Sequence, residues 1–64
     1  MPVINFEGPK MTKEQKAELV KAFVEQSSRI LNIPQEAFVT LIKENEMDNI
    51  GNGTRLLSEK MKEG

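Results

Sequence analysis

The run AFVTLIKE, residues 37–44, places apolar side chains at both odd and even positions. Because side chains alternate between the two faces of a β-strand, alternate residues of this run share a face. One face carries Phe38 and Ile42, and the other carries Val39 and Leu41. A strand that is apolar on both faces is typical of a sheet covered on both sides. The run therefore predicts a strand with a protein layer above it and another below it.

A shorter strand and a helix are predicted before this run. Residues 3–7 begin with β-branched side chains and alternate weakly, as a short strand does, and a Gly-Pro pair then turns the chain. Thr12 and Gln15 match the capping box that opens a helix. Apolar residues recur at helical spacing to about residue 31 or 32, where the Asn-Ile-Pro sequence ends the helix.

Strand, helix and strand within residues 1–64 predict an α/β (α+β) fold, built as a single βαβ domain with a right-handed crossover between two parallel strands. The sequence DNIGNGT at residues 48–54 predicts a turn or hairpin. The tail RLLSEKMKEG at residues 55–64 favours a helix by composition, but it is too short to be stable alone. We therefore expect the tail to pack on a neighbouring segment or to fray.

Composition predicts an oligomer. A chain of 64 residues with no cysteine and no histidine excludes disulfides, the usual zinc sites, thiol nucleophiles and a Ser-His-Asp triad. Small domains without such cross-links usually need oligomerisation. One helix also covers only one face of the predicted sheet, and a second copy of the chain is the simplest cover for the other face.

Other partners are not indicated. The net charge of −1, with both signs mixed, gives no reason to expect a nucleic-acid partner. No apolar stretch approaches a membrane span of roughly 20 residues, and no secretory leader is evident, so we expect a cytoplasmic protein. The acidic sequence ENEMDN at residues 44–49 lacks the spacing of a calcium loop and favours a solvated turn. No metal and no cofactor are predicted.

Two kinds of residue are candidates for chemistry. Pro2 is either the tolerated first residue of a strand or, once Met1 is removed, a secondary amine at the N-terminus. Lys10 and Lys43 are each more simply read as solvated charges, and they matter only if they converge on a pocket. The cations Arg29 and Arg55 are interpreted in the same way.

Several of these features together resemble the 4-oxalocrotonate tautomerase family of the tautomerase superfamily, and its DmpI-like branch in particular. The shared features extend over nearly the whole chain: Met1-Pro2 and the strand after it, the Glu-Gln-Lys sequence in the first helical turn, Ile-Pro before the second strand, Ile42 with Glu44, and Ile-Gly-Asn-Gly in the turn.

The resemblance implies βαβ subunits that commonly assemble as trimers of dimers, loss of the initiator methionine, and an N-terminal proline that carries protons between atoms of keto–enol acids. It also implies arginines that bind the substrate carboxylates. This chain departs from that pattern, since Met11 and Val39 stand where two arginines are typical, Ile50 replaces an aromatic wall of the proline pocket, and Thr54 replaces a glycine.

We therefore predict a tautomerase or isomerase with Pro2 as general base and acid, acting on small 2-hydroxy-dienoate or phenylpyruvate-like acids. Lys10 and Lys43 are predicted to bind the carboxylate, with Val39 and Ile50 as apolar walls. A homohexamer is expected. The alternative hypothesis is an oligomeric small-acid-binding module of the same fold without the chemistry, and retention of Met1 would favour it.

Overall fold

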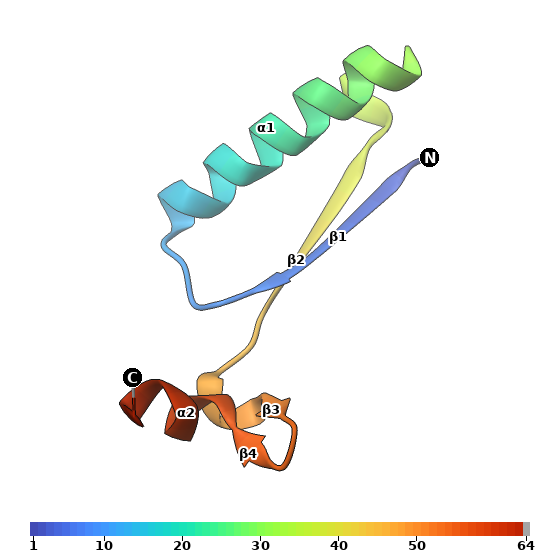
Figure 1. Cartoon of the computed structure of the whole chain (residues 1–64). Helices are drawn as coiled ribbons and strands as arrows, with labels where there is room; N and C mark the ends of the chain where they lie inside the picture. Colours follow the sequence, from blue (N-terminus) through green and yellow to red (C-terminus); the bar gives the residue numbers. More distant parts are fainter. Residues whose placement is uncertain (64) are drawn as a thin grey trace.

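The computed structural model describes residues 1–63 and shows two parallel strands joined by one long helix, followed by a small C-terminal unit (Figure 1). The strands pair in register from Val3 opposite Val39 to Gly8 opposite Glu44, which confirms the predicted βαβ unit. The first part of the chain consists of β1 (Val3–Gly8), α1 (Lys13–Leu31), the 3-10 turn η1 (Gln35–Ala37) and β2 (Val39–Glu44).

Helix α1 has the ends that its sequence predicts. At its start, Thr12 accepts a hydrogen bond from the Gln15 N–H (3.1 Å), and the Gln15 side chain accepts one from the Thr12 N–H (3.0 Å). At its end, Asn32 adopts the left-handed conformation (φ 56°), and its N–H donates to the Ser28 carbonyl. The capping box and the bounds of the helix are therefore as predicted.

Strand β2 begins two residues later than the predicted run 37–44. The Ala37 N–H donates to the Pro34 carbonyl (3.0 Å), and the Phe38 N–H donates to the Gln35 carbonyl (3.1 Å). Because these two amides close the turn η1, they are not available to the sheet. The first ladder bond is made by the Val39 N–H, which donates to the Pro2 carbonyl (3.0 Å).

Helix α1 covers one face of the strand pair. The Phe6 ring of β1 lies against the Phe23 ring of α1, with centroids 5.6 Å apart, and alternation places Val3 and Leu41 on the other face. The exposed fraction is 48% for Val3 and 54% for Leu41. Among residues 1–60, whose side chains are described, none is fully buried in the single chain.

The C-terminal unit lies beyond the Gly8–Glu44 end of the strand pair (Figure 1). It consists of the turn η2 (Met47–Asn49), the antiparallel hairpin of β3 (Gly51–Asn52) and β4 (Arg55–Leu56), and helix α2 (Leu57–Glu63). Gly53 turns the hairpin with φ +66°, a conformation that favours glycine. The predicted turn and helical tail are both present, with Gly64 outside the described residues.

Contacts within this unit hold α2 in place. The Leu57 N–H donates to the Ile50 carbonyl (2.8 Å), and the Lys60 ammonium donates to the Asn52 side-chain oxygen (3.0 Å). The helical tail therefore packs on its own hairpin and turn. Within residues 1–63, no helix is both long enough and apolar enough to cross a membrane.

Glu44 joins the end of β2 to the segment that precedes α1. Its Oε2 accepts a hydrogen bond from the Met11 N–H (2.8 Å) and lies 3.1 Å from the Lys16 ammonium. The Met11 hydrogen bond, followed by the Lys16 side chain, lowers the pKa of Glu44 below its ordinary value of 4.5. One carboxylate thus links three segments: β2, the connecting loop and the first turn of α1.

We expect this link to make stability depend on pH. Because the folded-state pKa of Glu44 is lowered, its charge stabilises the fold above about pH 4.5, and the effect is lost as the pH falls through the folded pKa. Glu44→Gln should therefore unfold at a lower urea concentration than the wild type at neutral pH. This difference should shrink as the pH falls below 4.5. A difference that stays equal as the pH falls from neutral to well below 4.5, at one protein concentration, would contradict the assignment.

The uncovered face of the strand pair predicts self-association. Light scattering at low micromolar concentration should give several times the 7.3 kDa subunit mass. Leu41→Lys should reduce that mass, because it places a charge on the uncovered face. Leu31→Lys is the matched control, since both leucines are 54% exposed but Leu31 lies at the end of α1. A cooperative folded monomer, or an unchanged mass for Leu41→Lys, would refute the prediction.

Candidate active site

Pro2 immediately precedes β1, and the strand pair holds it in place. Its carbonyl accepts the first ladder hydrogen bond, from the Val39 N–H, and its side chain is half-buried. A proline at this position costs the ladder no donor, because pairing begins with Val3. While Met1 is attached, the Pro2 nitrogen is an amide without a basic lone pair. Removal of Met1, which is 87% exposed, would leave a secondary amine at the end of the sheet.

Val39 is the predicted site residue that the fold places beside Pro2. It pairs with Val3 and is half-buried on the face that α1 does not cover. An aliphatic side chain here lowers the polarity around Pro2 and offers no charge to an anion. At the same end of the strand pair, a groove of about 420 Å³ lies between α1 and β2. Its lining includes Phe38, Thr40 and Lys21.

The other predicted site residues lie at the opposite end of the strand pair. Lys43 pairs in register with Glu7, and Lys10 follows the end of β1. Glu7 lies five positions after Pro2, which is roughly 16 Å along a strand at about 3.3 Å per residue. A single subunit therefore brings Val39 to Pro2 and keeps both lysines away from it.

Ile50 also lies at this far end, where it lines an apolar hollow of about 270 Å³ together with Met47, Leu57 and Pro9. The hollow lies where the C-terminal unit meets the end of the sheet. Within one chain, Ile50 therefore lies at the end of β1 rather than at its start, where Pro2 is.

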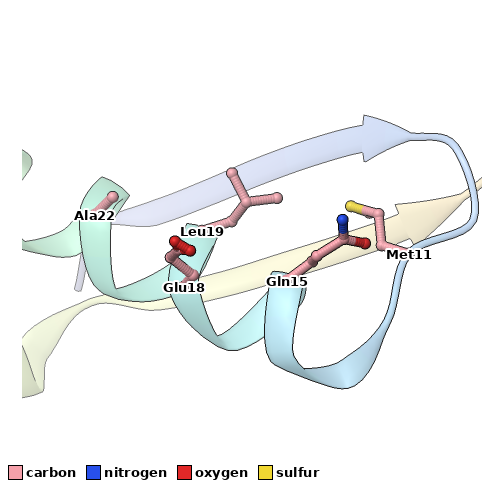
Figure 2. Close-up of a pocket in the computed structure, with 5 residues that line it drawn as sticks. All are labelled: Met11, Gln15, Glu18, Leu19 and Ala22. Carbon is pink, nitrogen blue, oxygen red and sulfur yellow. The ribbon is translucent and has the colours of Figure 1, made fainter.

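A third hollow, of about 440 Å³, runs along the side of α1 (Figure 2). It is lined by Met11, Gln15, Glu18, Leu19 and Ala22, all on one side of the helix and the loop before it. Met11 stands where the resemblance in sequence implies an arginine. The lining contains no cation, so this hollow offers no charge that would bind a carboxylate.

Charged partners distinguish the lysines near the β1–α1 loop. The Lys16 ammonium pairs with Glu44 (3.1 Å). Lys10 is exposed and makes no hydrogen bond or ion pair within the described part of the chain. Lys10 is thus the available cation of this loop. Among residues 1–63, no group of His, Cys, Asp and Glu side chains could hold a metal ion.

The role of Glu44 is the feature that sequence reasoning missed. The acidic sequence around Glu44 predicts a solvated strand end. The Met11 N–H, which donates a hydrogen bond to Glu44, lies 33 residues away in the sequence. No periodicity connects positions so far apart, and only the Ile-x-Glu pair marked the residue at all.

Comparison with known proteins identifies the family. The profile of the tautomerase enzyme family matches residues 2–60. The chain is similar to DmpI from Archaeoglobus fulgidus (30% identity, 89% of this chain and 98% of that chain, TM-score 0.81). It is also similar to an unfused 4-oxalocrotonate tautomerase in its apo form (32% identity, 92% and 98%, TM-score 0.83). DmpI from Helicobacter pylori matches as well (26% identity, 91% and 98%, TM-score 0.80).

The chain therefore belongs to the tautomerase enzyme family, and the predicted relationship to 4-oxalocrotonate tautomerases is confirmed. Its βαβ architecture is the fold of these relatives, for which oligomeric assembly is typical. Among curated protein sequences, none matches the chain significantly. Membership in this family supports tautomerase or isomerase activity in general. The catalytic base, the substrate and the number of subunits are proposed below.

Proposed function

We propose that the protein is a tautomerase of small keto–enol acids in which Pro2, freed by removal of Met1, is the general base and acid. The observation that carries this proposal is the position of Pro2. Its carbonyl is held by the Val39 N–H at the start of the sheet, in a chain of the tautomerase family. A rigid strand supports an amine at a fixed place, which proton transfer requires.

The proposed reaction conserves atoms and electrons. The Pro2 nitrogen accepts the hydroxyl proton of a 2-hydroxy-dienoate or an enol-phenylpyruvate. The oxygen electrons form the carbonyl, and the double-bond electrons then take a proton from the proline ammonium at carbon. The net change is an isomerisation, so no oxidant, reductant or cofactor enters the balance.

Apolar surroundings suit this role. A general base is most effective when its pKa is near the working pH, and a free secondary amine is more basic than that. Val39 beside Pro2 favours the uncharged amine, because a non-polar neighbour solvates the ammonium poorly. Ile50 would add to this effect if a second subunit brings it to Pro2.

We propose that different subunits supply the base and the anion-binding cations. Within one chain Lys43 pairs with Glu7, five strand positions from Pro2, which is roughly 16 Å at about 3.3 Å per residue, and Lys10 follows the same far end of β1. A second copy placed against the uncovered face could bring its lysines and its Ile50 to Pro2. A homohexamer is the assembly that we propose, which light scattering can distinguish from a dimer or a trimer.

The first test concerns the amine. The intact mass should show loss of Met1, and ketonisation of enol-phenylpyruvate should show an inflection below the pKa of an ordinary proline amine. Acylation of Pro2 removes the lone pair and should abolish nearly all activity, while Pro2→Ala leaves a primary amine and part of the activity. Loss of a general base typically costs about 10²–10⁴-fold in rate.

Pro34→Ala is the control for this test, because it changes a proline outside the proposed site. If acylated protein turns over as fast as free protein, Pro2 is only the first residue before a strand. If neither form turns over the acid but both bind it, the chain is a small-acid-binding module.

The second test concerns the carboxylate. Lys10→Ala and Lys43→Ala should each lower kcat/KM for an acidic enol by roughly 10- to 150-fold, which corresponds to about 1.5–3 kcal/mol for a lost charged hydrogen bond. Lys13→Ala is the matched control, since it removes the same charge from the exposed start of α1. Unchanged kinetics in both variants would turn attention to Arg29 and Arg55.

A further inference from the structure

One carboxylate oxygen of Glu44 interacts with two different donors. Its Oε2 accepts from the Met11 backbone N–H (2.8 Å) and from the Lys16 ammonium (3.1 Å). The side chains of Lys16 and Glu44 are 37% and 33% exposed, so the group lies at the surface. A ligand in solution can therefore contact the charged groups of Lys16 and Glu44.

The loop that carries Lys10 is held on both sides of that residue. The Asn45 N–H donates to the Gly8 carbonyl (2.8 Å), and Glu44 accepts from the Met11 N–H (2.8 Å). The Lys10 backbone lies between these two anchors, and its ammonium makes no hydrogen bond or ion pair among the described residues. The result is a fixed backbone that presents a free cation. The charge of Lys10 is among those that lower the pKa of Glu44, so the two groups are close enough to interact.

Glu44 also removes one positive charge from the neighbourhood of Lys10. Lys16 would be a second positive charge next to Lys10, but the ion pair with Glu44 neutralises it. Within the subunit, Lys43 does not take the place of Lys16. Lys43 lies on the other face of β2 from Glu44, and it pairs in register with Glu7. Each positive charge that is removed from this neighbourhood weakens binding of a dicarboxylate more than binding of a monocarboxylate, because the dicarboxylate carries two negative charges.

We propose that Glu44 is a specificity-determining residue, which positions the Lys10 loop and neutralises Lys16 so that the site favours a monocarboxylate enol over a dicarboxylate enol. This inference rests on the proposed function, because it assigns a substrate class to the same carboxylate-binding group. It is independent of which residue acts as the base.

The kinetic test compares two acids. Glu44→Gln keeps an amide oxygen that can accept from the Met11 N–H, but it frees Lys16. The ratio of kcat/KM for 2-hydroxymuconate, a diacid, to that for enol-phenylpyruvate, a monoacid, should rise by about two- to fivefold, as expected for one exposed charge pair. The double variant Glu44→Gln/Lys16→Met should return the ratio to the wild-type value. An unchanged ratio in Glu44→Gln, or a ratio still raised in the double variant, would overturn the proposal.

Glu44→Ala separates positioning from charge. It removes the acceptor for the Met11 N–H as well as the ion pair, so KM should rise for both acids with a smaller change in kcat. Glu44→Gln should restore KM for the monoacid. A KM for enol-phenylpyruvate that is equal in Glu44→Ala and the wild type, at unchanged subunit assembly, would contradict a positioning role.

A binding measurement distinguishes failure of this inference from failure of the proposed function. Phenylacetate and fumarate, which carry one and two carboxylates, can be titrated into protein acylated at Pro2, with the Met11 amide chemical shift as the signal. Tighter fumarate binding in Glu44→Gln supports the inference even if no variant turns over substrate. Normal turnover, with equal fumarate affinity in the wild type and Glu44→Gln, would refute the inference alone.

Discussion

The parallel pairing of β1 with β2 is the interaction on which the rest of the structure depends. Its register places Val3 opposite Val39 and Gly8 opposite Glu44, and the Val39 N–H holds the Pro2 carbonyl. The pairing thus positions the N-terminus at one end of the sheet and brings the end of β2 to the loop before α1 at the other. Neither strand has a second hydrogen-bonded neighbour among the described residues.

That pairing also explains why one subunit is an incomplete unit. Helix α1 covers one face, where Phe6 meets Phe23, and leaves the other face open. Even the covered face contains no fully buried residue among positions 1–60. Burial of apolar surface is the main favourable term in folding, and a chain of this size is marginal without more of it. Assembly and catalysis are therefore coupled in the proposed function, because the surface that needs a cover also separates Pro2 from the lysines.

Glu44 and Asn45 at the end of β2 organise the loop before α1, where the resemblance in sequence implies an arginine. The chain has Met11 at that position, and Met11 contributes a backbone donor to Glu44 and a side chain to the hollow beside α1. In the proposed function, the neighbouring Lys10 supplies the positive charge instead. A loop anchored at Gly8 and Met11 gives a flexible lysine a defined origin, which partly offsets the absence of the planar fork of arginine.

Local patterns were sufficient to predict most of the elements. The capping box at Thr12, the helical spacing of apolar residues and the Asn-Ile-Pro ending are signals contained within a few residues, and the helix has the predicted bounds. The start of β2 was wrong by two residues, because η1 uses the amides of Ala37 and Phe38 and apolar character does not reveal that. The family was also readable from the sequence, since its motifs occur in order along nearly the whole chain.

The sequence by itself therefore determined the βαβ order, the family and the candidacy of Pro2, because each depends on residues adjacent or periodic along the chain. The tertiary structure decided which candidates meet. It placed Val39 beside Pro2, kept Lys10, Lys43 and Ile50 at the far end, and joined Glu44 to the Met11 amide. These relations depend on strand register and on contacts across more than 30 residues of sequence. Short-range patterns carry no information about such distances, so only the folded chain reveals them.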